Sequence, residues 1–369
     1  MFLNSMDEHN CGTIYDELIE ILNQLELGWI AEQVEEILTA GKTVEEMVMG
    51  RKSPDLKLAY YSPQEQLLML IDAIDRTVIS GVEMEQEIAT LLDNQGLTTD
   101  FKSEISWHSN LAQKAEFVKF YQPEILERLA AAEQVRKTLG KLRVNSAKNQ
   151  PSLLTEIKVN LEAIVNPHLR RHKQLRNLFI LYIFNIIVAG AKNEGGKVSY
   201  KDVTKQATDR LIFRQRPGQI YEKTQPYTHA LIEFANKPPL EIHMGVKVHG
   251  RLRVLYDCDI CVLYKMEADA CRNNGREPRA SRILLGVNCE YSASELQPEV
   301  AQAFLSLASE LRVAGDCYFV SNSVSEVAGK LLASRKRKWE CGIIPGDVNN
   351  VNRLMYGFQT IFKDFQAKS

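Results

Sequence analysis

Three carboxylates in the carboxy-terminal half of the 369-residue chain have a spacing that suits metal chemistry. Asp257 and Asp259 interrupt the apolar, strand-like run 253–264, and Glu290 follows the next apolar run, 281–288. Side chains two residues apart on a strand point the same way, and two acids on one face of a covered sheet need a cation, a proton or water. These acids are candidate ligands of a divalent cation, and a hydrogen-bonded structural pair of Asp257 and Asp259 is the alternative.

Charge is divided unevenly along the chain. The formal net charge is -2, but residues 1–100 carry 20 Asp and Glu against 5 Lys and Arg, whereas residues 101–369 carry 27 against 40. Such a division indicates different partners for the two parts. The 45% hydrophobic and 25% charged composition is typical of a soluble globular protein, and the length predicts two or three domains.

The seven cysteines are an odd number and lie mostly in apolar runs, with no signal peptide before them. This usage favours a reducing cytoplasm. A zinc site built on Cys258 and Cys261 is disfavoured, because the two side chains lie on opposite faces of a regular strand. Buried thiols are the preferred interpretation.

Residues 1–100 are expected to form an acidic helical bundle. A hydroxyl residue stands three positions before an acid at Thr13, Thr43 and Ser62, which is the capping pattern that opens a helix. The bundle holds no plausible catalytic constellation, so its acids are either a solvated surface or a docking site for a protein partner.

Residues 101–152 are expected to form a helical connector that is interrupted at Pro123 and ends in the polar linker 141–152. The 14-residue apolar run 178–191 is shorter than the roughly 20 residues that span a bilayer. It predicts a buried helix at 174–193, and no membrane contact is expected.

The third domain, 153–369, changes from helical to alternating periodicity. Capping pairs predict helices that start at Ser292 and Ser323. After the buried helix, the expected order is a helix at 199–213, strands at 241–248, 252–264 and 281–288, a helix, a strand at 317–320, a helix, a strand at 339–344 and a helix at 347–366. The fold class is α+β, an all-helical amino-terminal bundle followed by a mixed sheet flanked by helices.

This order of elements, with an acid on the second strand, resembles the PD-(D/E)xK nuclease superfamily, the restriction-endonuclease-like fold. Residues from about 175 to 366 are similar to an uncharacterised bacterial group within it. The matching motifs are Pro217-Gly218, Glu241-Ile242-His243-Met244-Gly245, Asp257-Cys258-Asp259 and Asn288-Cys289-Glu290. The last motif departs from the pattern, because Asn288 and Glu290 stand where an acid and a lysine are usual.

The resemblance implies metal-dependent hydrolysis of phosphodiesters in nucleic acid, with DNA favoured, by an endonuclease that uses Mg²⁺ or Mn²⁺. Asp259, Glu290 and Asn288 would be catalytic, and the metal would be held by Asp259, Glu290, Asp257 and Glu241. His243, beside Glu241, is expected to be a strand histidine satisfied by a neighbour. The basic residues expected to bind the nucleic acid are Arg214, Arg216, Lys247, Arg251, Arg335, Lys336, Arg337 and Lys338.

Two functions follow from this resemblance. The first is a cytoplasmic nuclease, an effector of a bacterial antiviral defence or conflict system, recruited to a protein partner through its amino-terminal helices. The alternative is a catalytically inactive nuclease-like domain that serves as a nucleic-acid-binding or assembly module. A homodimer is compatible with either.

Overall fold

The structure is a computed structural model that describes residues 8–49, 61–93, 98–99, 117–144, 150–166, 169–204, 206–208, 210–214, 216–222, 227–311 and 316–367. The chain divides into two compact units. Unit 1 comprises residues 1–83, 124–175 and 292–295, and unit 2 comprises residues 84–123, 176–291 and 296–369.

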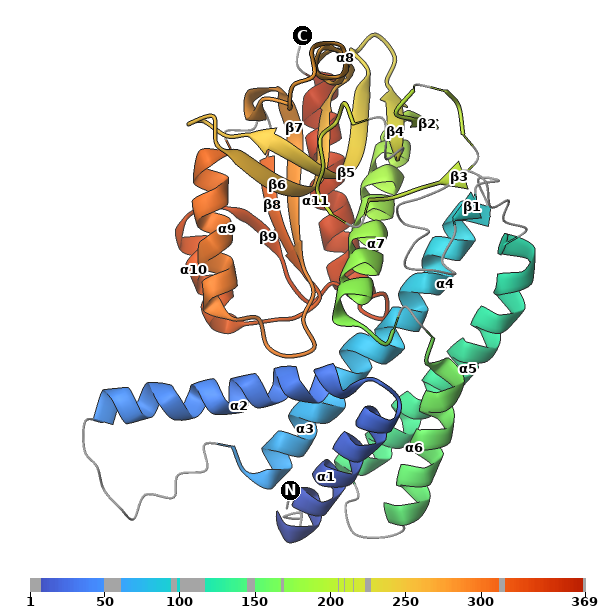
Figure 1. The fold of residues 1–369 in the computed structure, drawn as a ribbon, viewed down its shortest axis with the longest axis vertical. Helices are drawn as coiled ribbons and strands as arrows, with labels where there is room; N and C mark the ends of the chain where they lie inside the picture. Colours follow the sequence, from blue (N-terminus) through green and yellow to red (C-terminus); the bar gives the residue numbers. More distant parts are fainter. Residues whose placement is uncertain are drawn as a thin grey trace. The chain divides into compact units, whose positions relative to one another are not determined.

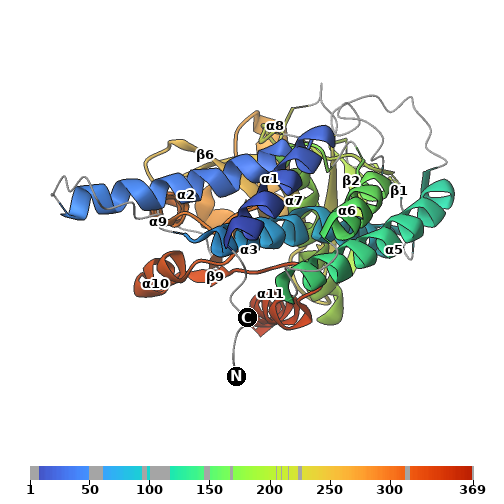
Figure 2. The same ribbon diagram turned by 90° about the horizontal axis from the view of Figure 1, so that it is seen from below.

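Unit 1 is helical. It contains α1 (Glu8–Gln24), α2 (Gly28–Met49), α3 (Pro63–Ile74), α6 (Gln150–Ile164) and most of α5 (Phe117–Val144). Helix α1 packs against α2, α3 and α6 (Figures 1 and 2). Helices α5 and α6 are joined by a hydrogen bond from the Arg128 side chain to the Ile164 carbonyl, 3.1 Å long. The chain passes between the two units after residues 83, 123, 175, 291 and 295, and none of these points lies in the segment 141–152, where the linker was predicted.

The capping predictions in unit 1 had different outcomes. Ser62 caps α3 as predicted: its hydroxyl accepts from the Glu65 N–H at 3.3 Å, and its own N–H donates to the Glu65 carboxylate at 2.7 Å. Thr13 and Thr43 lie inside α1 and α2, so they begin no helix. Helix α3 continues through a π-helical turn (Asp75–Ile79) into α4 (Ser80–Asp93), and α5 runs through Pro123, where an interruption was predicted.

Unit 2 is built on a seven-stranded mixed sheet in the order β2-β4-β5-β6-β7-β8-β9, so the predicted α+β class is confirmed at that level. Within this sheet β2, β4, β5, β6 and β7 pair antiparallel, and β7, β8 and β9 pair parallel. The strands are β2 (Lys197–Asp202), β4 (Thr228–Glu233), β5 (Leu240–His249), β6 (Leu255–Tyr264), β7 (Ile283–Glu290), β8 (Asp316–Ser321) and β9 (Lys338–Glu340). A separate two-residue pair joins β1 (Thr98–Thr99) to β3 (Arg210–Leu211).

All five predicted strands are present, but the predicted helix at 199–213 is wrong. Residues 197–202 instead form β2, which pairs with β4 over its whole length, from Lys197 opposite Glu233 to Asp202 opposite Thr228. Pairing across the sheet outweighs a weak helical pattern, because each strand residue gains a partner on β4.

Helices cover both faces of the sheet. On β8, Tyr318 packs on Phe358 of α11 (Val348–Ala367), whereas its neighbour Phe319 packs on Phe304 of α9 (Pro298–Glu310). Successive strand side chains point to opposite faces, so α11 and α9 lie on opposite sides (Figure 1). Helix α7 (His172–Asn193) packs against α11, and α8 (Lys265–Asn274) and α10 (Glu326–Ser334) lie on the side of α9.

The starts of α9 and α10 differ from the predictions. Helix α9 begins after Gln297 with Pro298 in its first turn, so Ser292 does not cap it. Helix α10 is capped by Ser325, whose hydroxyl accepts from the Ala328 N–H at 3.3 Å, and not by Ser323. Helix α8 was not predicted.

Helix α7 is the predicted buried helix. Among the described residues it alone is long and apolar enough to cross a membrane, but 89% of its apolar window is buried within the protein. Burial to that extent is typical of a core helix, which agrees with the prediction made from the run 178–191.

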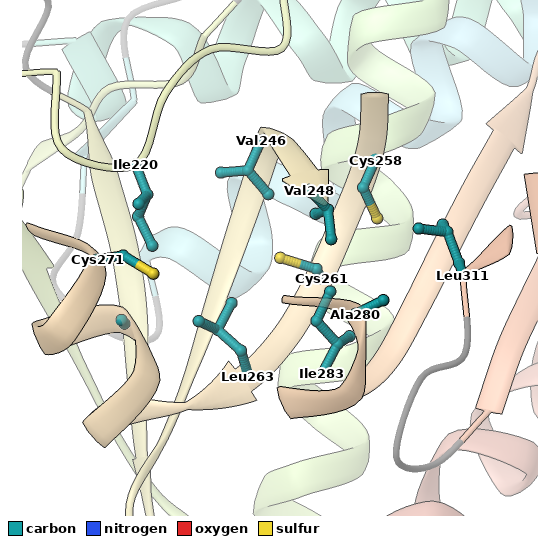
Figure 3. Close-up of a cluster of buried hydrophobic side chains, with 11 residues drawn as sticks. Ile220, Val246, Val248, Cys258, Cys261, Leu263, Cys271, Ala280, Ile283 and Leu311 are labelled. Carbon is teal, nitrogen blue, oxygen red and sulfur yellow. The ribbon is translucent and has the colours of Figure 1, made fainter. Parts of the chain in front are cut away.

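A buried cluster on the α8 side of the sheet holds both Cys258 and Cys261 (Figure 3). The prediction that these side chains lie on opposite faces is therefore wrong, because β6 departs from regular alternation between them. Gly245, which lies opposite Asp259 on β5, has the left-handed φ of +59° at the same level of the sheet. All seven cysteines are buried and none forms a disulfide, as the sequence indicated.

Replacement of Gly245 by alanine is expected to destabilise unit 2 by about 1 kcal/mol, because a side chain is strained at this φ. Gly190→Ala in α7 is the matched control: its new Cβ would meet Phe358 at an ordinary 3.6 Å, and helix propensity improves. In urea denaturation, the unfolding midpoint of Gly245→Ala should be lower than that of wild type. The midpoint of Gly190→Ala should be equal to that of wild type or higher. A Gly245→Ala protein as stable as wild type would show that a side chain is not strained at this φ.

Candidate functional site

Asp259 of β6 forms the centre of the candidate site, and its partner is Arg176 of α7. One guanidinium nitrogen, Nη2 of Arg176, lies 2.9 Å from Oδ1 and 3.0 Å from Oδ2 of Asp259. The same nitrogen donates to the Cys289 carbonyl of β7 at 3.1 Å, and the Cys289 N–H donates to Oδ2 of Asp259 at 2.8 Å. Three oxygens therefore converge on one positively charged nitrogen.

The electrostatics of this pair follow from its burial. The Asp259 side chain is 9% exposed and that of Arg176 is 32% exposed. Burial raises the pKa of Asp259, although Arg176 and the Cys289 N–H oppose the rise. Burial alone would lower the pKa of Arg176, but Asp259, Cys289 and Glu290 together outweigh burial and raise it. Arg176 thus supplies the cation that a carboxylate at this depth requires.

Glu290, Asp257 and Asn288 surround this pair less closely. Glu290 ends β7 and is half-buried, and burial raises its pKa while Arg176 lowers it and Asp259 adds to the rise. Asp257 is exposed, and in the part of the chain that the structure describes no hydrogen bond joins it to Asp259, so the alternative of a hydrogen-bonded structural pair is not supported. Asn288 is half-buried and has no hydrogen bond to the site within the described part of the chain.

The pocket beside Asp259 is small. It is lined by Arg176, Asn177, Ile180, Arg214, Arg216, Pro217, Met244, Gly245 and Asp259. Its volume is about 20 Å³, which is room for about one water molecule. A hydrated cation with a phosphodiester needs more space than this pocket offers.

The metal ion implied by the resemblance does not fit the site in this conformation. Asp259 is the predicted ligand at its centre, and both of its carboxylate oxygens already accept hydrogen bonds from Arg176. Among the residues that the structure describes, no three His, Cys, Asp or Glu side chains are grouped to hold a metal.

Glu241, predicted as a metal ligand, belongs to a different buried group. Both of its oxygens accept from Arg272 of α8 at 2.8 Å, and His243 lies 2.9 Å from one of them. Burial would raise the pKa of Glu241, but hydrogen bonds from His243 and Arg272 outweigh it and lower the pKa. His243 also contacts the Tyr227 hydroxyl at 3.0 Å, so it is satisfied by its neighbours as expected.

The basic residues predicted to bind nucleic acid fall into two groups. Arg214 is buried: it donates to the Gln219 carbonyl at 2.6 Å and lies 3.7 Å from the centre of the Tyr227 ring, so it is a structural residue. The others are at least partly exposed. They are Arg216, Lys247, Arg251, Arg335, Lys336, Arg337 and Lys338.

Arg176 is the site residue that sequence reasoning missed. It stands close to Arg170, Arg171 and Lys173 in a basic stretch just before the apolar run 178–191. A signal was present, because Asp259 in an apolar strand demands a buried cation and Arg176 is the member of the stretch nearest to the apolar run.

Comparison with known proteins identifies no relative. A scan against protein-family models, a search of curated proteins and a search of solved structures each found no match to this chain. The chemistry of the site therefore rests on its own geometry.

Replacement of Arg176 by methionine is expected to destabilise the protein in a pH-dependent way. Without the cation, the pKa of Asp259 in the folded protein rises further above its value in the unfolded chain. At high pH the buried carboxylate is charged and destabilises the fold. This destabilisation decreases as the pH falls and the carboxyl is protonated. The loss should be about 1–3 kcal/mol at pH 8, below the usual cost of breaking a buried pair because Arg176 is partly exposed. Denaturant unfolding at pH 8 and pH 5 measures the difference.

The control for this experiment is Arg176→Lys, which keeps the charge and should lose less stability than Arg176→Met at pH 8. An Arg176→Met protein that loses the same stability at both pH values would contradict the electrostatic role assigned to the pair.

Proposed function

We propose that unit 2 is a nuclease-like domain that binds nucleic acid, with DNA favoured, and does not hydrolyse it while Arg176 is paired with Asp259. The observation that supports this proposal is the position of Arg176 Nη2, within 3.1 Å of both carboxylate oxygens of Asp259 and of the Cys289 carbonyl. A guanidinium neutralises the carboxylate without the open coordination positions that a metal offers to water.

The remaining residues are better suited to bind nucleic acid than to hydrolyse it. Arginine stays protonated at any physiological pH, so Arg176 is unsuited to accept a proton from water. Glu290 stands where the resemblance expects a lysine, and its burial raises its pKa. The phosphate backbone would be held by the exposed basic residues Arg216, Arg335, Lys336 and Lys338 and by the half-buried Lys247.

A second candidate is metal-dependent phosphodiester hydrolysis. It is favoured by the exposure of Arg176, 32%, because a partly solvated side chain can leave the pocket. Asp259, Glu290 and the Cys289 carbonyl would then be available to Mg²⁺ or Mn²⁺, which supplies a polarised phosphate and a more acidic water. In this case the protein is a nuclease that stays inactive until Arg176 withdraws.

The cellular role we propose is the same for both candidates. The acidic amino-terminal helices recruit the protein to a basic protein partner, and the assembly acts in the cytoplasm as part of a bacterial defence or conflict system. The acidic balance of residues 1–100 supports a partner of opposite charge.

The test compares four proteins on plasmid, linear duplex, single-stranded DNA and RNA with Mg²⁺ or Mn²⁺. They are wild type, Arg176→Met, Asp259→Ala and the double variant Asp259→Ala, Glu290→Ala. The proposal predicts that wild type binds nucleic acid less tightly as salt is raised and cleaves none of the substrates.

Cleavage by wild type that the double variant lacks would overturn the proposal and establish the second candidate. Cleavage by Arg176→Met alone would show that Arg176 blocks a competent site. Equal cleavage by all four proteins would signal a contaminating nuclease, and absence of nucleic-acid binding by wild type would refute both candidates.

A further inference from the structure

We propose that a second pocket of unit 2 binds a phosphorylated ligand of nucleotide size through its phosphomonoester or diphosphate group. This arginine pocket is distinct from the Asp259 pocket and does not depend on the function proposed above. Its lining residues include Arg251, Arg253, Arg276 and Arg279, together with His249 and Glu277.

The arginine pocket is large enough for a small molecule. Its volume is about 630 Å³, compared with about 20 Å³ beside Asp259. Sites for small molecules and cofactors usually enclose roughly 300–1,000 Å³. Four guanidinium groups around such a concavity favour an oxyanion with several oxygens, since each guanidinium matches phosphate geometry with paired N–H groups.

Two of the arginines are held in place by a buried acid. Glu267 of α8 is 5% exposed, and its oxygens accept from Nη1 of Arg276 at 2.8 Å and from Nη2 of Arg279 at 2.8 Å. Burial would raise the pKa of Glu267, but the hydrogen bonds from Arg279 and Arg276 lower it to about 2. Because Glu267 is ionised, it fixes both guanidinium groups before any ligand arrives, which reduces the entropy lost on binding.

The same two arginines keep donors for a ligand. Within the described part of the chain, no protein acceptor lies within hydrogen-bond distance of Nη2 of Arg276 or Nη1 of Arg279. Charged donors that are fixed by one carboxylate and still have N–H groups available are suited to bind an anion.

The other two arginines belong to the tight turn between β5 and β6. Arg251 and Arg253 are exposed, and no carboxylate among the described residues pairs with either side chain. The turn is anchored by hydrogen bonds from Gly250 N–H to the Val254 carbonyl at 2.9 Å and from Arg251 N–H to the Glu310 carbonyl at 3.0 Å. Arg253 has a left-handed φ of +59°, a strained conformation that accumulates at functional sites.

Acidic residues limit the net positive charge of the pocket and so restrict the kinds of ligand that it can bind. Glu267, Glu277 and Glu310 stand against the four arginines, and Glu277 already contacts the Tyr221 hydroxyl at 3.3 Å and His249 at 3.5 Å. A long polyanion gains little from so small an excess of positive charge, whereas one compact phosphate group that reaches the free N–H groups gains several charged hydrogen bonds.

The test is isothermal titration of the full-length protein with inorganic pyrophosphate, ADP, and matched oligonucleotides that carry a 5′-phosphate or a 5′-hydroxyl. The variant Arg251→Gln, Arg253→Asn removes two charges, and asparagine tolerates the left-handed φ at position 253. Arg282→Gln is the matched control, because Arg282 is exposed in the same segment but does not line the pocket.

Wild type and Arg282→Gln should bind at least one phosphorylated probe equally, and the double variant should bind it about tenfold more weakly, since it loses charged donors. Binding of ADP and pyrophosphate identifies a free nucleotide, whereas a preference for the 5′-phosphorylated oligonucleotide alone identifies the end of a nucleic acid. Failure of wild type to bind any phosphomonoester or diphosphate probe, or equal binding by the double variant with an unchanged melting temperature, would overturn the proposal.

Discussion

The burial of Asp259 in the middle of the sheet is the constraint on which the candidate site depends. A carboxylate at that depth requires a cation and hydrogen-bond donors, and here it receives both from neighbouring elements. Arg176 reaches it from α7, and the Cys289 N–H reaches it from β7. The same guanidinium donates to the Cys289 carbonyl, so one side chain joins α7, β6 and β7.

The other buried acids of unit 2 obey the same requirement. Glu241 is held by Arg272, and Glu267 by Arg276 and Arg279. Arginine suits these positions because its planar guanidinium satisfies both oxygens of a carboxylate. The arrangements differ in what they leave available: the Asp259 and Glu241 groups are enclosed, whereas the Glu267 group turns two arginines toward an open pocket. Buried pairing thus determines which basic residues can meet a ligand.

Much of the architecture of unit 2 could be predicted from the sequence, because strands such as 252–264 and 281–288 are recognisable from the periodicity of their apolar residues. It missed both β2 and β4, and residues 197–202 become a strand only through their pairing with β4. It also placed Cys258 and Cys261 on opposite faces, because a local irregularity in a strand leaves no clear mark in the residue pattern.

At the site, the sequence identified Asp259 and Glu290 but not the partner that decides the chemistry. Asp259 and Arg176 are 83 residues apart, so no local pattern connects them. The grouping of Arg251 and Arg253 with Arg276 and Arg279 was hidden for the same reason: it arises only when the turn after β5 meets the segment that precedes β7. The sequence alone therefore does not show which charged residues, far apart along the chain, pair in the folded protein.

The central claim is that Arg176, and not a metal ion, is the cation bound to Asp259. It is tested most directly by a crystal structure of wild-type protein grown with Mn²⁺, with data collected for the anomalous signal of the metal. The account predicts Arg176 between Asp259 and the Cys289 carbonyl, with no anomalous peak at that position. A peak bound by Asp259 and Glu290, with Arg176 turned away, would contradict it.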